Sequence, residues 1–304
     1  MQKQCEPFDL TLYKPKRLLG SNIHEVYEVE NTQTGQIMAL KKISSTTIEG
    51  HLSTLNEIDL LFKCRHPHIV HIYGYNESTE TTLEGKTRFI TNIFMEKLDE
   101  SFITILEKNK INPKLFKKEE LMELIDSVLS GFWYLELKEK PHGDFRPGNL
   151  MIKYNQKTQK TMFKIIDVIG AQKLYLISNS KQATENKNLE YVAPEILEAI
   201  RQEKFNCFIN FHKADVFSVG LVFLNAALME PDFKNEQLNQ GTNASKKKLE
   251  KKLAVVEKNY GSEIKTLFES MLDNNNKTRP SFDELAAKRK LVFKQSYEIE
   301  EEEK

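Results

Sequence analysis

The residues best suited to chemistry lie in one short segment, residues 142–149, which reads HGDFRPGN. In this segment an acid, Asp144, is followed five residues later by an amide, Asn149, and then by an apolar run. A loop with this spacing can aim a carboxylate at a hydroxyl group and an amide oxygen at a metal ion. The alternative without chemistry is a turn that the Asp or Asn side chain stabilises.

Other charged residues stand at the ends of apolar segments. Lys41 ends a strand-like run, and Glu57 follows sixteen residues later within a helical pattern. Asp167 ends a second apolar run. A lone lysine at a strand end is usually a solvated surface group, and an aspartate there is often a turn former.

Residues 142–149 resemble the catalytic loop of eukaryotic protein kinases, whose usual form is H-R-D-L-K-P-x-N. Further matches follow in family order, namely MALK at 38–41, IID at 165–167, YVAPE at 191–195, ADVFSVG at 214–220 and TRP at 278–280. The resemblance covers roughly residues 13–293. It implies an α+β fold, the two-lobed protein kinase fold, with a small β-rich N-lobe and a larger α-helical C-lobe.

The resemblance also implies catalytic and metal-binding roles. Asp144 would orient the substrate hydroxyl, and Arg146 stands where the family usually has a lysine near the transferred phosphoryl group. Lys41 would grip the α- and β-phosphates of ATP. Asn149 and Asp167 would hold Mg²⁺, so ATP and magnesium are the expected cofactors.

The residues that the resemblance assigns to nucleotide binding are Gly20, Val26, Ala39, Lys41, Glu57, Glu96 and Leu98. Glu57 would pair with Lys41 and so position it. Glu96 and Leu98 would belong to the hinge beside the adenine. Two further roles are structural: Asp215 would hold the backbone of the catalytic loop, and Glu195 would pair with Arg279.

The chain departs from the family pattern in the phosphate-covering loop. Asn22 and Glu25 replace its second and third glycines. At about 10 Å and an effective dielectric of about 20, the Glu25 charge would repel each phosphate charge by roughly 1.7 kcal/mol. If the side chain turns to solvent, most of this repulsion vanishes. We therefore expect weakened, not abolished, ATP binding.

Two more departures lie near the catalytic loop and the metal site. Gly143 removes the arginine that in many relatives docks a phosphorylated activation loop, so Ser178, Ser180 and Thr184 are weak candidates for phosphorylation. Ile169 replaces the glycine of D-F-G, and a β-branched residue there restricts how that segment can flip.

Hydrophobic periodicity predicts the elements that position these residues. The expected strands and helices are 18–43 (strand-like, with a turn at 31–35), a helix at 49–64, a strand at 88–95, a helix at 119–137, strands at 150–153 and 162–166, and a buried helix at 216–228. The expected domain organisation is an extension at 1–12, a kinase domain at 13–293 (N-lobe about 13–97, C-lobe about 98–293) and an acidic tail at 294–304.

Composition narrows the class of protein. The 304 residues carry zero formal net charge and a pI of about 7.1, so bulk attraction to nucleic acid is not expected. The lysine cluster at 246–252 is interpreted as a solvated helix face. No signal peptide or membrane span is predicted, and a cytoplasmic protein without a membrane or nucleic-acid partner is expected.

The function that this pattern favours is a protein serine/threonine kinase that transfers the γ-phosphate of Mg-ATP to a protein hydroxyl. The alternative is a kinase-like binding module or allosteric scaffold with little turnover. A third reading, phosphorylation of a small molecule or lipid, is disfavoured by the YVAPE and Asp215 segments. The protein substrate and the oligomeric state stay open.

Overall fold

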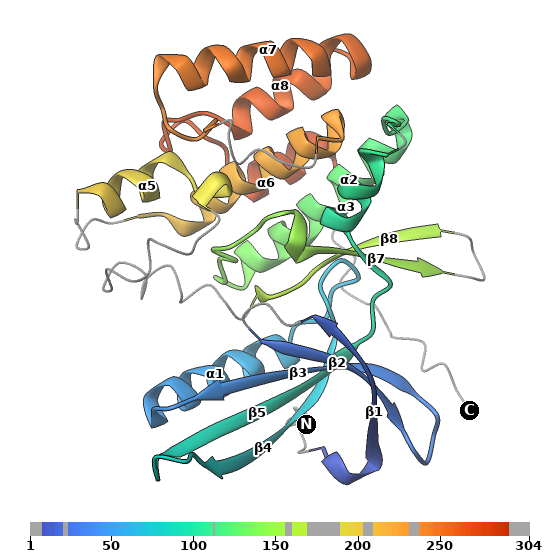
Figure 1. The fold of residues 1–304 in the computed structure, drawn as a ribbon. Helices are drawn as coiled ribbons and strands as arrows, with labels where there is room; N and C mark the ends of the chain where they lie inside the picture. The colour runs from blue at the N-terminus through green and yellow to red at the C-terminus, as the bar shows by residue number, and fades with distance from the viewer. Residues whose placement is uncertain are drawn as a thin grey trace. The chain divides into compact units, whose positions relative to one another are not determined.

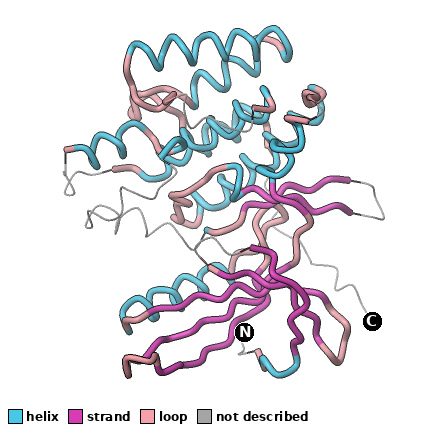
Figure 2. Tube along the Cα trace, viewed as in Figure 1, coloured by secondary structure: helices cyan, strands magenta, loops and turns pink. Residues whose placement is uncertain are grey.

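The computed structural model describes residues 8–20, 24–111, 113–155, 160–168, 189–202, 209–230 and 237–291, apart from the side chains of Glu57 and Leu60. The chain divides into two compact units, with the boundary between Asp99 and Glu100 (Figure 1). The first unit is dominated by strands and the second by helices, as the magenta and cyan segments of Figure 2 show. The expected α+β fold is confirmed.

The first unit is a five-stranded antiparallel sheet with one long helix. The strand order is β1-β2-β3-β5-β4, and the strands are β1 (Tyr13–Gly20), β2 (Glu25–Asn31), β3 (Ile37–Ser45), β4 (Ile72–Thr81) and β5 (Thr87–Glu96). The strand-like stretch predicted at 18–43 thus contains parts of three strands. Gly35, at φ 72°, makes the predicted turn between β2 and β3 in a backbone region where glycine carries no steric penalty.

The two faces of this sheet pack differently. One face carries a hydrophobic cluster made by Val29, Met38, Leu40 and Phe94, with aromatic rings of Phe8, Tyr13, Tyr27 and Tyr73 around it. Side chains alternate along a strand, so Ala39 and Lys41 point to the opposite face. Helix α1 (Ile48–Phe62) contacts strands β3, β4 and β5 on that opposite face, as its contacts with Phe89 and Thr91 (below) establish.

Helix α1 confirms the helix predicted at 49–64, with one change in its buried stripe. Ile58 is 0% exposed and packs against the sheet, as the periodicity indicates. Leu52 is 52% exposed although it belongs to the same apolar pattern, while His51 is buried. An α-helix turns by about 100° per residue, so His51, seven residues before Ile58, lies on the same face of the helix as Ile58. Leu52, six residues before Ile58, lies more than 100° away from that face.

The second unit contains the remaining strands and most helices of the described chain. A three-stranded sheet joins β6 (Glu100–Ser101), β7 (Leu150–Asn155) and β8 (Lys160–Ile165). The helices are α2 (Phe102–Asn109), α3 (Lys118–Leu137), α5 (Pro194–Arg201), α6 (Phe211–Leu228), α7 (Asn243–Tyr260), α8 (Ser262–Met271) and α9 (Phe282–Arg289), with short 3-10 turns at Pro147–Asn149 and Leu189–Tyr191; a further 3-10 turn, Leu10–Leu12, lies in the first unit.

Two helices form the core of this unit. Helix α3 buries all of its predicted apolar positions: Leu121, Leu124, Ile125, Val128, Leu129, Phe132 and Leu135. Helix α6 is buried almost all round, as its continuous apolar sequence predicts. By length and composition α6 alone among the described helices could cross a membrane, but 78% of it is buried inside the protein, as in the core helix of a globular domain.

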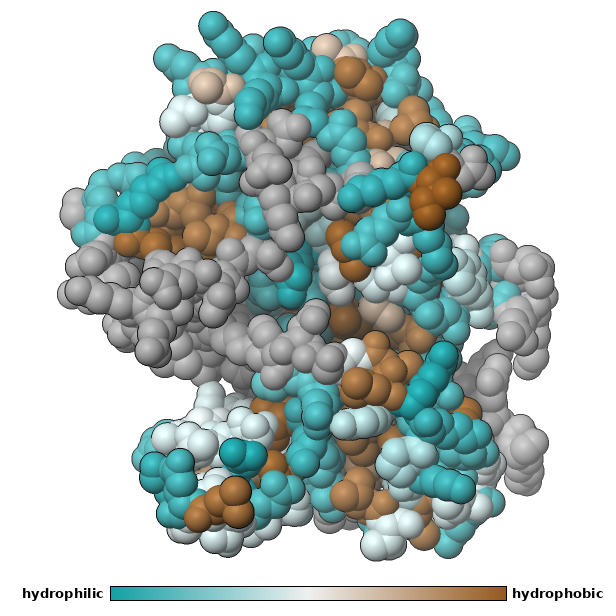
Figure 3. Space-filling model, in the orientation of Figure 1, coloured by the Kyte–Doolittle hydropathy of each residue, from teal (hydrophilic) through white to brown (hydrophobic). Residues whose placement is uncertain are grey.

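The predicted lysine cluster lies on the outer side of α7. Lys246, Lys247 and Lys251 are exposed, and Lys252 pairs with Glu230. Figure 3 shows a largely hydrophilic surface over this helix at the top of the view. The lysine cluster is therefore a solvated helix face, as predicted.

Candidate active site

The backbone of the catalytic-like loop is held by a buried carboxylate. Asp215 Oδ2 accepts a hydrogen bond from the His142 backbone N–H at 2.6 Å, and Oδ1 accepts one from the Gly143 N–H at 2.8 Å. Asp215 lies in the second turn of α6, and the core packing of that helix fixes its position. The structural role predicted for Asp215 is confirmed.

Burial raises the pKa of the Asp215 carboxyl from 3.8 to about 7. The hydrogen bonds from Gly143 and His142 favour the ionised form and offset part of this rise, whereas the nearby charges of Asp144 and Glu136 add to it. The loop is therefore anchored to a carboxyl whose ionised form is disfavoured by burial and favoured by the two hydrogen bonds that hold the loop.

Gly143 adopts a backbone conformation that suits its residue type. Its φ is 76°, in the left-handed region that L side chains rarely adopt. Gly143, which replaces the family arginine, thus lets the backbone turn without steric strain between His142, which Asp215 holds, and Asp144.

His142 connects the loop to the end of β8. Its Nε2 is 2.9 Å from the Ile166 carbonyl oxygen, and its Nδ1 accepts from the Asp144 backbone N–H at 3.3 Å. These partners require a neutral ring protonated on Nε2. Burial lowers the pKa of His142, and the carboxylates of Asp144 and Asp167 oppose this only in part. The neutral form is therefore the one that the fold accommodates.

Aromatic rings pack around His142 and keep the loop rigid. Phe145 is 1% exposed and meets Phe132 of α3 edge to face, with ring centroids 4.8 Å apart. Phe132 also stacks on Phe282 at 4.9 Å. Phe132 belongs to the predicted apolar stripe of α3, whereas no role was predicted for Phe145, whose only signal is its place beside Asp144. Such pairs are worth roughly 0.5–1.5 kcal/mol beyond their burial.

Three of the predicted site residues lie together in this loop. The Asn149 side-chain nitrogen donates to the Asp144 carbonyl oxygen at 2.7 Å. Arg146 Nε lies 3.6 Å from Asp144 Oδ2, so the guanidinium and the carboxylate are within ion-pair range. Asp144 keeps 44% of its side chain exposed, which leaves its carboxylate accessible from outside the unit.

Asp167 is joined to the same loop through its neighbour. The Ile166 N–H donates to the Asn149 carbonyl oxygen at 3.0 Å, and the Ile166 carbonyl faces His142. Asp167 follows β8 at a φ of 63°, a conformation that costs a non-glycine residue of the order of 1 kcal/mol or more. The structure thus brings together the loop of Asp144, Arg146 and Asn149 and the turn that carries Asp167.

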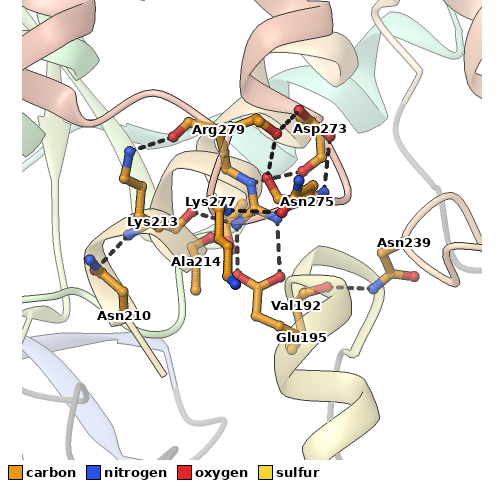
Figure 4. Close-up of polar contacts among 12 residues, drawn as sticks. Val192, Glu195, Asn210, Lys213, Ala214, Asn239, Asp273, Asn275, Lys277 and Arg279 are labelled. Carbon is orange, nitrogen blue, oxygen red and sulfur yellow. Dashed lines mark hydrogen bonds and ion pairs between the residues drawn. The ribbon is translucent and has the colours of Figure 1, made fainter. Parts of the chain in front are cut away.

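A buried ion pair between Glu195 and Arg279 fixes the YVAPE segment, residues 191–195, in the second unit. Arg279, 0% exposed, binds both carboxylate oxygens of Glu195, at 2.7 Å from Nη1 and 3.0 Å from Nη2 (Figure 4). Its other donors reach the backbone carbonyls of Asp273 and Lys213, at 2.9 and 2.7 Å. The predicted Glu195–Arg279 pair is confirmed.

Asn239 also anchors this segment, and the sequence analysis missed it. Its side-chain nitrogen donates to the carbonyl oxygens of Leu189 and Val192, at 2.6 and 2.8 Å, and the residue is 1% exposed. Ser218 of α6 adds a hydrogen bond to the Tyr191 carbonyl at 2.7 Å. An isolated Asn that lies 50 and 47 residues after its partners has no local signal that would identify it.

Four of the predicted nucleotide-binding residues lie on one face of the sheet in the first unit. Gly20 is opposite Val26 in the β1–β2 pair, and Val26 is opposite Lys41 in the β2–β3 pair. Residues directly opposite one another share a face, and Ala39 shares it with Lys41 by alternation. Lys41 is only 9% exposed. Helix α1 packs on this same face, over β3, β4 and β5.

The other residues that the sequence singled out in this unit lie at the end of β5, just after it, on α1 and at the start of β2. Glu96 ends β5, and its side chain accepts a hydrogen bond from the His71 backbone N–H at 2.8 Å. Leu98, just after β5, is 8% exposed. Glu57 lies on α1, but its side chain is outside the described residues. Glu25 is exposed, so its charge is turned towards solvent.

Several positions singled out in the sequence lie outside the described residues. They are Asn22, Ile169, Ser178, Ser180 and Thr184.

Comparisons with known proteins agree with this arrangement. A family model described as "Protein kinase domain" matches residues 13–290. Similar curated proteins are a "Probable cell division protein kinase" of Encephalitozoon cuniculi (27% identical) and "Cyclin-dependent kinase 4" of Xenopus laevis (28%). "Serine/threonine-protein kinase 4 homolog B" of Dictyostelium discoideum is 22% identical.

These alignments cover 75%, 73% and 68% of this chain. They cover 76%, 65% and 16% of the three relatives, in the same order, so the chain spans less than two thirds of two of them. The match to the family model extends over most of the chain, and it includes both units and every loop described above. The chain belongs to the protein kinase domain family.

Proposed function

We propose that this protein is an active serine/threonine protein kinase, which transfers the γ-phosphate of ATP to a protein hydroxyl. In this proposal Asp144 accepts or orients the hydroxyl proton of the substrate. Arg146, beside it, places a cation near the transferred phosphoryl group. Lys41 grips the α- and β-phosphates, and Glu57 holds Lys41 in place. The serine/threonine class is supported by the Arg146-Pro147 pairing and by the name of the Dictyostelium relative.

The observation that carries the proposal is the way in which the loop of Asp144 is held. Asp215 holds the backbone immediately before Asp144, and His142 and Ile166 join the loop to the turn of Asp167. A catalytic side chain must be kept close to its productive geometry by groups that are themselves fixed. A loop retained only as a scaffold has no need of an exposed, oriented carboxylate at its centre.

The donor atoms in this loop fit a magnesium ion. The Asn149 amide nitrogen is used by the Asp144 carbonyl, which leaves the amide oxygen, a hard ligand, for a cation. The described residues contain no group of three His, Cys, Asp or Glu side chains that could hold a metal. We therefore expect Asn149 and Asp167 to bind magnesium together with phosphate oxygens and water. When bound, the ion neutralises phosphate charge.

The proposal is tested by phosphate transfer from radiolabelled Mg-ATP to a generic protein substrate. Replacing Asp144 with Asn is expected to lower the rate by roughly 10²- to 10⁴-fold, the usual contribution of a general acid–base group. Asp59→Asn, at an exposed carboxylate paired with Lys63 on α1, is the matched control and should retain the wild-type rate. Wild-type incorporation no higher than that of Asp144→Asn would refute the kinase proposal.

A binding module with little turnover is the second candidate. It is favoured by the phosphate-covering loop, where Asn22 and Glu25 lack the backbone freedom of the glycines that they replace. Thermal-shift titration separates the two: stabilisation by ATP that requires magnesium and is lost in Asp167→Ala supports an intact metal site. Stabilisation by ATP without magnesium, together with absent transfer, would favour the binding module.

A further inference from the structure

Helix α1 is attached to the sheet at two places of different chemistry. Its C-terminal half is held by apolar side chains, with Ile58 at 0%, Leu61 at 7% and Phe62 at 9% exposure. In its first half, among the side chains that the structure describes, only His51 is buried, at 8% exposure. The attachment of this half therefore depends on an imidazole ring where the helical period would place an apolar residue.

The His51 ring contacts two adjacent strands. Nε2 is 3.1 Å from Glu77 Oε2 on β4, and Nδ1 is 3.3 Å from Thr91 Oγ1 on β5. The carboxylate accepts from Nε2–H, and the rotatable Thr91 hydroxyl donates to Nδ1. The ring also stacks on Phe89, with centroids 4.9 Å apart and 16° between the planes.

The partners of His51 form a continuous patch on the sheet. Glu77 and Thr91 are directly opposite each other in the β4–β5 pair, and Phe89 lies two residues before Thr91 on the same face. In the β3–β5 pair, Lys41 is opposite Ile93, two residues after Thr91. The patch that receives His51 and the face that carries Lys41 are thus one surface.

We propose that His51 is a positioning residue, which fastens the first half of α1 to β4 and β5 and so holds Glu57 of the same helix where it can pair with Lys41. This rests on the proposed function, because it assigns to Glu57 the task of orienting Lys41. Thr91 is 1% exposed, so a ring without nitrogen would leave a buried hydroxyl without its partner. The first two turns of α1 would then separate from the sheet more readily.

The test compares His51→Phe, which keeps a ring to stack on Phe89, with Leu52→Ala, an exposed neighbour on the same helix. His51→Phe should raise the KM for ATP about tenfold and leave the KM for the protein substrate unchanged. Loss of folded protein alone would lower the apparent kcat and leave both KM values as they are. His51→Gln, which can still donate to Glu77, should restore part of the ATP affinity, and Leu52→Ala should match the wild type.

Two further measurements link the effect to the helix. Hydrogen exchange of the amides of residues 48–54 should be about tenfold faster in His51→Phe, with residues 58–62 unchanged. In a Glu57→Gln background, His51→Phe should raise the KM for ATP no further, because the pathway through Glu57 is already broken. If His51→Phe does not fold, the milder variants Glu77→Gln and Thr91→Val replace it in these measurements.

The outcomes separate this inference from the proposed function. If the wild type transfers phosphate but His51→Phe resembles Leu52→Ala in ATP affinity and exchange, the positioning role is overturned and the kinase function stands. If the wild type transfers no more than Asp144→Asn, the kinase function fails. In that case, the role of His51 is still decided by two comparisons of the wild type with His51→Phe. One is the dissociation constant of fluorescent Mg-ATP, and the other is the hydrogen exchange of α1.

Discussion

The two units hold their functional residues by different means. In the second unit, buried charged groups fix the loop of Asp144 and the segment of Glu195: Asp215 is 2% exposed and Arg279 is 0% exposed. In the first unit, Lys41 lies in a sheet with ion pairs at its surface, such as Arg17–Glu28, where the arginine side chain is 65% exposed. The helix beside that sheet is fastened by apolar side chains and one imidazole.

This difference indicates which parts can move. A buried ion pair is strongly directional, and losing one partner leaves an uncompensated charge, so the geometry around it is tightly constrained. Surface ion pairs are worth little, and a helix half held by one hydrogen-bonded ring can detach at modest cost. In the proposed mechanism, the loop of Asp144 is therefore fixed by the fold, whereas the position of α1 beside Lys41 can change.

The largest effect is expected at the buried ion pair. Arg279→Met should lower the free energy of unfolding by about 3–5 kcal/mol, because Glu195 would remain buried without its partner. Chemical denaturation of the full chain measures this loss. A change below about 1 kcal/mol would show that the second unit does not depend on buried charge and would remove the contrast between the units.

The pH dependence of stability should reveal the charge of Asp215. Its pKa is about 7 in the native state and 3.8 in the unfolded chain, so between about pH 4 and 7 the native state binds a proton that the unfolded state lacks. This contribution to stability therefore falls as the pH rises through that window, by up to about 1.4 kcal/mol per pH unit, and is constant above it. Asp215→Asn removes the contribution.

Asp215→Asn should accordingly be more destabilised relative to the wild type at pH 5 than at pH 8. His142, whose pKa is lowered by burial, acts in the opposite direction below its unfolded value of 6.5, and it remains in the variant. The variant should thus lose stability as the pH falls from 6.5 to 5. Denaturation at four pH values provides the comparison. A constant difference between Asp215→Asn and the wild type would contradict the assignment.

A smaller effect is expected from the backbone of the catalytic loop. Gly143→Ala should cost about 1–2 kcal/mol, because φ 76° is unfavourable for a residue with a Cβ. Gly148→Ala in the same loop is the matched control: an added Cβ would lie 3.5 Å from the Arg146 guanidinium, an ordinary contact. Equal thermal shifts for the two variants would show that the left-handed turn at Gly143 does not disfavour a residue with a Cβ.

The smallest effect is expected at the surface of the first unit. Arg17→Ala breaks an exposed ion pair with Glu28 and should change the free energy of unfolding by about 0–1 kcal/mol. The difference should shrink further in 0.5 M salt, because exposed charges are screened. A loss comparable to that of Arg279→Met would mean that both units depend on ion pairs to the same degree.

Much of the fold and of the second-unit site could be predicted from the sequence. Local patterns determine which residues form helices: α3 and α6 follow directly from apolar periodicity and continuity. The order of the motifs indicated the family, and the resemblance to that family implied the Asp215 contact and the Glu195–Arg279 pair. The lysines of α7 lie on a solvated face, as their charge indicates.

Other features depended on contacts that no local pattern encodes. His51 takes a buried position that the apolar stripe assigned to its neighbour Leu52, because the cross-strand partners Glu77 and Thr91 satisfy its ring nitrogens. Asn239 holds the carbonyls of Leu189 and Val192, although nothing near it in the sequence marks it.

The sequence by itself determined the family, the order of the elements and the residue types available for chemistry, because these depend on side-chain identity and on spacing along the chain. The family resemblance implied that Asp215 would hold this loop, but only the tertiary structure decided which N–H groups it binds, those of His142 and Gly143, and that burial raises the pKa of its carboxyl to about 7. The physical reason is that hydrogen bonds and desolvation act between atoms close in space, whatever their separation in sequence.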